Sequence, residues 1–217
     1  VFVDGSIVEG FANDRQAIAR LCYPTSRQNN RVMFSLAQKE MTFAAWVKGS
    51  STTAWQRIFD FGNGEGEYLF LTPTNGSNMR FEIKKDGVIQ GLDAPSRLGL
   101  ASWKHVAVTI GTEEVSIYID GELEATTTDI TLRPSDIAPT MSYLGRSQFD
   151  ADPTFKGMMS DVRIYNYALT ASEVKSISSE TISTSGYDIT AEADAVLENV
   201  PAIGDYRIMV PGIPVLV

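Results

Sequence analysis

Short runs in which apolar and polar residues alternate constrain the fold of this chain more than any other feature of the sequence. Successive side chains of a β-strand point to opposite faces, so a period of two is typical of a strand with one buried face. The 3.6-residue spacing of apolar residues that is typical of an amphipathic helix is almost absent from the sequence. The clearest apolar sets are Phe43, Ala45 and Val47; Phe81 and Ile83; Val106, Val108 and Ile110; Val115, Ile117 and Ile119; and Val162 and Ile164.

Tight-turn dipeptides separate these runs and supply the positive φ angles that short hairpins require. They are Asn63-Gly64, Asn75-Gly76, Asp86-Gly87 and Asp120-Gly121. Strands at this spacing, without helices between them, favour an antiparallel sandwich over a parallel α/β sheet. One short helix is predicted over 170–177, where Thr170 followed by Glu173 has the pattern of a capping box.

The charge of the chain excludes several classes of partner. With 27 acidic and 18 basic residues among 217, the formal net charge is -9. Nucleic acids and anionic membranes bind basic surfaces, so we expect neither as a partner, whereas a neutral glycan is compatible. No run reaches the roughly 20 apolar residues that a membrane-spanning helix needs. A single cysteine, Cys22, excludes an intrachain disulfide and a multi-cysteine zinc site.

The N-terminal segment resembles a known enzyme family. Residues 2–24, FVDGSIVEGFANDRQAIARLCYP, resemble the closing strands of the C-terminal β-sandwich of glycoside hydrolase family 32, which contains invertases, levanases and inulinases. The matching residues are Asp4, Ser6, Glu9, Phe11, Asn13, Arg20, Tyr23 and Pro24. This resemblance implies that the chain is a segment of a secreted bacterial glycosidase that acts on fructans. The catalytic domain of the same parent chain is then a partner.

The central part of the chain resembles a laminin-G-like domain of the concanavalin A-like lectin/glucanase superfamily. The resemblance lies in the stretches MTFAAWVKG, RIFDFGNG, SWKHVAVTI, VSIYIDGELEA, YLGRS and FKGMMSDVRIYNYALTASEV. It implies an all-β fold, an antiparallel two-sheet jelly-roll sandwich.

Three parts are therefore expected along the chain. Residues 1–30 would be a remnant of the family 32-like sandwich, and residues 31–178 the laminin-G-like jelly roll. Residues 179–217 would be a linker and the truncated start of a following module, which resembles an immunoglobulin-like repeat.

We expect no catalytic site in this chain, because the family 32 carboxylates belong to a propeller that the sequence lacks. A glucanase needs two carboxylates paired on one strand. Glu65 and Glu67 come closest to this pattern, but they lie in a glycine-rich loop, which argues against a glucanase site. His105, the only histidine, occupies a packing or hydrogen-bonding position of the laminin-G pattern rather than a place in a serine triad.

The superfamily resemblance also implies a structural Ca²⁺ in some members, for which Asp161 is a candidate ligand. No full ligand set is assigned.

Sugar sites combine an aromatic platform with a few polar groups. Trp46 and Trp103 fall at laminin-G pattern positions and are assigned to packing. Trp55 lies outside the pattern, which makes it the candidate platform; a loop residue folded over the sandwich edge is the alternative. The acidic residues of the QFDADP loop are equally compatible with simple solvation. The candidate carbohydrate-binding residues are Trp55, Arg57, Arg146, Phe149, Asp150 and Asp152.

The two resemblances together lead to one functional hypothesis. The chain would be a non-catalytic carbohydrate-binding accessory region of an extracellular or cell-surface glycoside hydrolase. It would hold a polysaccharide near the catalytic domain and so raise its effective concentration. A fructan is the favoured glycan. The alternative is a structural spacer or interaction module without a glycan ligand, and a glucanase is the third and weakest candidate.

Overall fold

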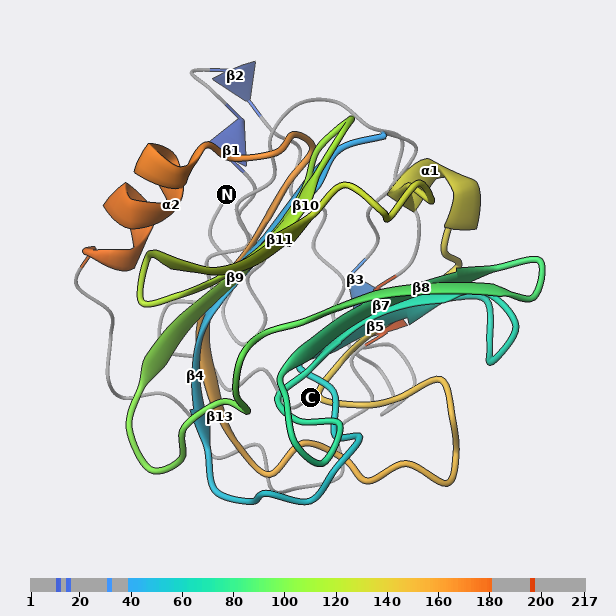
Figure 1. Ribbon diagram of the computed structural model, residues 1–217, viewed down its shortest axis with the longest axis horizontal. Helices are drawn as coiled ribbons and strands as arrows, with labels where there is room; N and C mark the ends of the chain where they lie inside the picture. Colours follow the sequence, from blue (N-terminus) through green and yellow to red (C-terminus); the bar gives the residue numbers. More distant parts are fainter. Residues whose placement is uncertain (1–10, 13–14, 17–30, 33–38, 181–195, 198–217) are drawn as a thin grey trace.

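The computed structural model describes residues 11–12, 15–16, 31–32, 39–180 and 196–197 (Figure 1). The segment that resembles family 32 and the tail lie outside the described residues, apart from three short strands. These are β1 (Phe11–Ala12), β2 (Arg15–Gln16) and β14 (Val196–Leu197). The laminin-G-like segment is described almost completely.

The first sheet has five antiparallel strands in the order β11-β10-β9-β4-β13. Its register aligns the apolar positions that the sequence predicts to be buried, because Phe43 pairs with Val108 on one side and with Ile164 on the other. The strands are β4 (Met41–Gly49), β9 (Lys104–Ile110), β10 (Val115–Ile119), β11 (Glu122–Thr127) and β13 (Gly157–Tyr165).

The second sheet contains five antiparallel strands in the order β12-β5-β6-β7-β8. Beyond β12 it is extended by β14, antiparallel to β12, and by β3 (Arg31–Val32), parallel to β14. β1 and β2 form a separate pair. The five strands are β5 (Phe59–Gly62), β6 (Tyr68–Thr72), β7 (Arg80–Lys85), β8 (Val88–Asp93) and β12 (Met141–Leu144).

Two of the four predicted turns are tight hairpins. At Asn63-Gly64 and Asn75-Gly76 only the glycine has a positive φ, and each pair lies in a longer connection between strands. Asp86 and Gly87 join β7 to β8 with φ of 50° and 80°, and Asp120 and Gly121 join β10 to β11 with φ of 53° and 79°. Two consecutive positive φ angles match the right-handed twist of the strands that they connect. The two Asp-Gly dipeptides are therefore sufficient to predict these two hairpins.

The two sheets face each other across one hydrophobic core (Figure 1). The alternating residues predicted to be buried form this core, and an aromatic group joins the sheets at its centre. The ring of Phe59, from the second sheet, lies 4.4 Å from that of Phe43 in the first sheet and 4.7 Å from that of Phe61. The predicted all-β, two-sheet jelly-roll sandwich is confirmed.

Helix α2 (Ala171–Ser178) covers part of the outer face of the first sheet (Figure 1). Its buried residue Val174 packs with Ala44 and Ala107, whose small side chains let the helix approach the strands. The predicted capping box is present, since Glu173 N donates to Thr170 Oγ1 and Thr170 N donates to Glu173 Oε2. A one-turn helix, α1 (Pro134–Ile137), was not predicted.

Truncation of the central aromatic residue should show how far the fold depends on it. We expect Phe59→Ala to lower the free energy of unfolding by about 3–5 kcal/mol, because Phe59 is fully buried and its loss leaves a cavity between the sheets. Urea denaturation followed by circular dichroism measures this. Leu123→Ala, at an exposed position of β11, is the control and should change stability by less than about 0.5 kcal/mol. Equal effects of the two substitutions would contradict the assignment of the core.

Candidate functional site

The outer face of the second sheet is partly buried, although it points away from the core. In β6, Leu69 and Leu71 face the core, so Tyr68 and Phe70 point outward, yet both are buried. An antiparallel sheet commonly leaves such a face to water. Here side chains from two loops, 50–58 and 145–156, lie on these rings. Arg57 is 3.9 Å above the ring of Phe70, and the ring of Phe149 is 5.5 Å from that of Tyr68.

Arg57 joins the two loops to the sheet. Its Nε donates to Asp60 Oδ2 at 3.2 Å, and its Nη2 donates to Asp152 Oδ2 at 2.7 Å. Its Nη1 donates to the carbonyl oxygen of Trp55 at 2.5 Å. Only 2% of the Arg57 side chain is exposed. All three guanidinium nitrogens are therefore engaged within the protein, and Arg57 fixes the positions of groups around it.

Asp60 lies under the loop that carries the second group of candidate residues. Its Oδ2 accepts a hydrogen bond from the backbone N–H of Gln148 at 3.0 Å and lies 3.4 Å from Ser147 Oγ. Its Oδ1 is buried and has no hydrogen-bond partner among the described residues. Burial raises the pKa of Asp60 to about 7, against the opposing effects of Gln148 N–H and Arg57. This carboxyl therefore exchanges its proton close to neutral pH.

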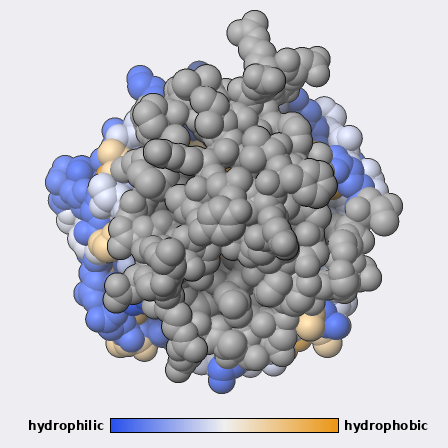
Figure 2. Space-filling model, turned by 180° about the vertical axis from the view of Figure 1, so that it is seen from behind, coloured by the Kyte–Doolittle hydropathy of each residue, from blue (hydrophilic) through white to orange (hydrophobic). Residues whose placement is uncertain are grey.

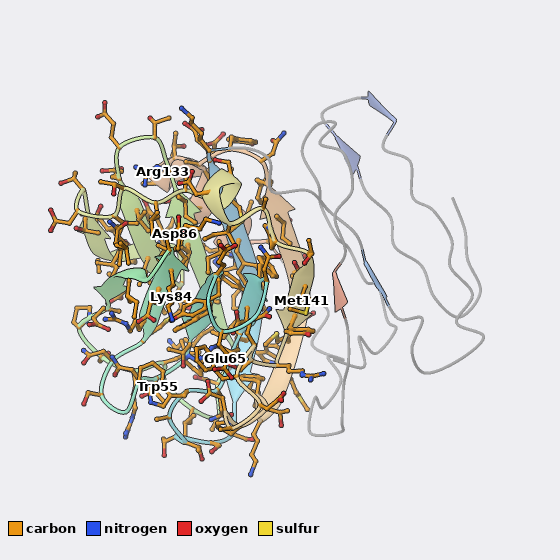
Figure 3. The ribbon with its side chains drawn as sticks, turned by 90° about the vertical axis from the view of Figure 1, so that its right-hand side faces the viewer. Trp55, Glu65, Lys84, Asp86, Arg133 and Met141 are labelled. Atoms are coloured by element: carbon orange, nitrogen blue, oxygen red, sulfur yellow. The ribbon has the colours of Figure 1, made fainter. Side chains whose placement is uncertain are left out.

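Trp55 is held in an uncommon backbone conformation. Its φ is 65°, in the left-handed region that bulky residues rarely enter. Two hydrogen bonds hold it there: Trp55 N donates to Thr74 O at 2.9 Å, and Trp55 O accepts from Arg57. With 39% of its surface exposed, Trp55 is presented to solvent at the end of the molecule opposite Arg133 (Figure 3). Backbone strain of this kind often marks functional positions.

The second loop brings the remaining candidates to the same face. The guanidinium of Arg146 lies 4.9 Å from the ring of Tyr143, and its Nη2 is 3.9 Å from Asp150 Oδ1. Asp150 is almost fully exposed, whereas Asp152 is half-buried and also accepts from Ser147 Oγ at 2.9 Å. The six residues predicted from two separate sequence segments are thus brought together. Arg57 and Asp152 serve internal contacts, while the others reach the surface.

Polar residues along the neighbouring strands extend this surface. Tyr68 Oη donates to Glu82 Oε1 at 2.8 Å, and burial raises the pKa of Tyr68, which keeps its phenol neutral. Arg80 joins Glu82 and Asp93 through ion pairs of 2.8 and 2.7 Å. Lys84 Nζ donates to the carbonyl oxygen of Glu65, in the loop before β6, whereas Trp55 is bonded to Thr74, just after the opposite end of β6. These polar side chains are paired mainly with one another, and Asp93 is the most exposed of the Tyr68, Glu82, Arg80 and Asp93 group.

Sequence reasoning missed several residues of this face, among them Asp60, Phe70 and Gln148. Gln148 connects three elements, since its Nε2 donates to Met141 O at 2.9 Å and its Oε1 accepts from Gly64 N at 3.0 Å. A signal for Asp60 was present. In the stretch FDFG, Asp60 lies between Phe59 and Phe61, which point into the core, so the alternation places the Asp60 side chain on the outer face of the strand.

The residues considered for glycosidase chemistry have other roles. Glu67 forms an ion pair with Lys85 at 2.5 Å, and hydrogen bonds from Lys85 and Asn63 hold the pKa of Glu67 below its usual range. It is therefore no general acid near neutral pH. Glu65 is exposed in the same loop between β5 and β6.

His105 and Asp161 lie away from this face. His105 is buried and packs edge-on against Trp46, with ring centroids 5.5 Å apart. Its pKa falls to about 4, because of burial and the nearby charge of Arg163. Both oxygens of Asp161 accept hydrogen bonds from Arg163, so they do not fit a calcium site. Among the described residues no group of three His, Cys, Asp or Glu side chains could hold a metal ion.

The visible surface of the described residues is mostly hydrophilic. Figure 2, seen from behind, shows hydrophilic residues around most of the coloured rim with small separate apolar areas. Within the part of the chain that the structure describes, no helix is long and apolar enough to cross a bilayer.

Residues 26–175, more than half of the chain, match the laminin-G-type family described as the concanavalin A-like lectin/glucanases superfamily. The chain therefore belongs to this family. A curated relative, usherin of Rattus norvegicus, is 30% identical over 148 residues, which are 62% of this chain and 3% of usherin. Usherin of Mus musculus is 25% identical over 149 residues, again 62% of this chain and 3% of that protein. The chain thus spans only a small fraction of these relatives.

Similar solved structures include sugar-binding modules of enzymes. The CBM40 domain of the Ruminococcus gnavus IT-sialidase, bound to α2,3-sialyllactose, has a TM-score of 0.59 and 22% identity, covering 66% of this chain and 84% of that chain. Domain 4 of AbnA, a GH43 extracellular arabinanase of Geobacillus stearothermophilus in complex with arabinotriose, has a TM-score of 0.59 and 20% identity. The match covers 81% of this chain and 82% of that chain. At these identities the likeness shows the shared fold.

The raised pKa of Asp60 gives a testable pH dependence of stability. A carboxyl whose pKa is near 7 in the folded state and 3.8 in the unfolded state binds more protons when folded between these values. Its contribution to the free energy of unfolding is therefore largest below about pH 4. Between the two pKa values this contribution falls by about 1.4 kcal/mol for each unit of pH, and it is lost by about pH 7. His105 acts in the opposite direction over part of this window, because its pKa is lowered.

The contribution of Asp60 is isolated by comparing wild type with Asp60→Asn in urea denaturation at several pH values between 4 and 8. We expect the variant to gain stability relative to wild type as the pH rises toward 7. The total change should be a few kcal/mol. A difference that stays constant over this range would show that Asp60 does not titrate there.

Proposed function

We propose that this chain is a non-catalytic carbohydrate-binding accessory module of an extracellular glycoside hydrolase. One observation carries the proposal: Trp55 is exposed in a strained conformation and held by hydrogen bonds on both sides, one of them from Arg57, which also binds the loop that carries Phe149. A sugar ring would stack on Trp55, while Phe149, Arg146 and Asp150 would contact its edges.

The surrounding network supports this assignment of roles. Arg57 and Asp152 hold the two loops in place, and the groups that remain accessible are an indole, a phenyl ring and side chains that can bond hydroxyl groups. The structural neighbours support it as well, because two of them are sugar-binding modules within glycosidases. The identity between them and this chain is too low to transfer their ligands.

The favoured glycan is a fructan such as levan or inulin, in keeping with the resemblance of residues 2–24 to family 32. The acidic character of the chain also favours a neutral polymer over an anionic one. The module would act by tethering. By holding the polymer beside the catalytic domain of the parent chain, it raises the effective substrate concentration without new chemistry. In this proposal residues 1–30 end the preceding sandwich and residues 179–217 lead to a following module.

The proposal predicts that the purified chain binds a neutral polysaccharide through Trp55. In calorimetric titrations with levan, inulin and arabinan, we expect Trp55→Ala to weaken binding at least tenfold, about 1.4 kcal/mol. The loss would come from removing the stacking platform. Leu123→Ala, which removes an exposed apolar side chain from β11, is the matched control and should bind as wild type does.

Each outcome of this experiment decides between functions. Binding to levan or inulin would support the fructan assignment. Binding to arabinan alone would keep the module and reject fructan. No binding to any of the polymers would favour the spacer, and binding that survives Trp55→Ala would remove Trp55 from the site.

A further inference from the structure

Arg57 is directed into the protein rather than toward solvent, because its side chain is only 2% exposed and each of its three nitrogens donates to a group of the protein. The guanidinium carbon lies 3.9 Å from the centre of the Phe70 ring, and the guanidinium donates to Asp60, Asp152 and the carbonyl oxygen of Trp55. It is nonetheless the group shared by the two loops that carry the exposed candidates. Any change in its position would move Trp55 and the 145–156 loop together.

Asp60 is the fixed point of this network, because it belongs to strand β5 rather than to a loop. Its Oδ2 holds Arg57 on one side and the backbone N–H of Gln148 on the other. Gln148 directly precedes Phe149, the aromatic residue of the second loop. The charge on one buried oxygen therefore acts on both aromatic residues of the site. The second oxygen, Oδ1, has no partner among the described residues, so it is available to take up a proton.

Building on the function proposed above, we propose that Arg57 and Asp60 are positioning residues of the glycan site, and that glycan affinity follows the charge on Asp60. With Asp60 ionised, its charge-assisted hydrogen bonds fix Arg57 and Gln148, and the site is organised for binding. Protonation of Asp60 weakens both bonds. The two loops then lose their common anchor, and the ligand has to order them when it binds.

The charged and titratable groups around Asp60 come from five elements. Arg57 lies on the preceding loop, and Asp152 on the loop after β12. Tyr68 lies on β6, next to Glu82 on β7. The fifth element, β12, places Tyr143 beside Asp60 in the register. Burial keeps Tyr68 neutral, whereas the pKa of Asp60 lies at about 7.

The expected sign of the effect separates positioning from a purely structural role. Burial favours the neutral form of Asp60, so its contribution to stability decreases as the pH rises from about 4 to 7. Glycan binding requires the ionised form, so affinity should increase over the upper part of that range. A side chain that only supported the fold would change both quantities in the same direction. If the glycan lowers the pKa of Asp60 by about one unit, affinity rises about tenfold.

The first experiment is calorimetric titration of levan into the chain from pH 5.5 to 8.5, with arabinotriose as a second neutral probe. We expect wild-type affinity to rise about tenfold, and Asp60→Asn to bind at the low-pH level throughout. Arg57→Lys keeps the positive charge, but an ammonium cannot reproduce the planar guanidinium that bonds Asp60, Asp152 and Trp55 O together, so this variant should also bind levan weakly. Asp129→Asn removes an equal charge from an exposed segment after β11 and is expected to follow the wild-type curve.

The second experiment requires no glycan. With fluorinated tryptophan, the ¹⁹F resonance of Trp55, assigned with Trp55→Phe, should shift with a midpoint near pH 7 in wild type and stay fixed in Asp60→Asn. Trp46 and Trp103 serve as internal controls. A Trp55 resonance that does not follow Asp60 overturns the positioning role, even if levan binds. If the Trp55 resonance follows the protonation of Asp60 but neither levan nor arabinotriose binds, the positioning role is supported and the proposed function is rejected. Wild-type affinity that is independent of pH overturns the coupling.

Discussion

The organisation of the candidate face depends on one buried guanidinium. Arg57 lies between two carboxylates and on an aromatic ring, and it ties two loops, far apart in the sequence, to strand β5. A buried ion pair contributes little net stability, because desolvation offsets much of the attraction. Its value here is geometric. It selects one arrangement of Trp55 and the 145–156 loop from the many that two loops could adopt.

This arrangement is possible because the second sheet uses its two faces differently. Phe59 and Phe61 point into the core, and the intervening Asp60 points to the other side. The core face holds the sandwich together by apolar burial alone. The outer face is then free to carry polar and aromatic side chains, with a rigid sheet beneath them. Functional groups gain precision when they stand on such a support.

Membership of the concanavalin A-like lectin/glucanases superfamily establishes the architecture and leaves the ligand to local features. Structural neighbours with the same sandwich bind sialyllactose in one case and arabinotriose in another. In this chain the distinctive features are the strained, exposed Trp55 and the carboxyl of Asp60, whose pKa lies near 7. In the proposed site, Trp55 would serve as the platform for a ligand, and Asp60 would be the group that responds to pH.

Local features of the fold could be predicted from the sequence: the strands with alternating apolar residues, the hairpins at Asp86-Gly87 and Asp120-Gly121, and the capped helix at Thr170. Each depends on residues close together in the chain, so alternation and turn chemistry suffice to predict them. The sequence also singled out Trp55 and the residues around Phe149. Tertiary structure alone decided that these two segments meet, because their contact joins residues almost a hundred positions apart. It also made Arg57 an internal anchor and raised the pKa of Asp60, since burial is a property of the packed fold.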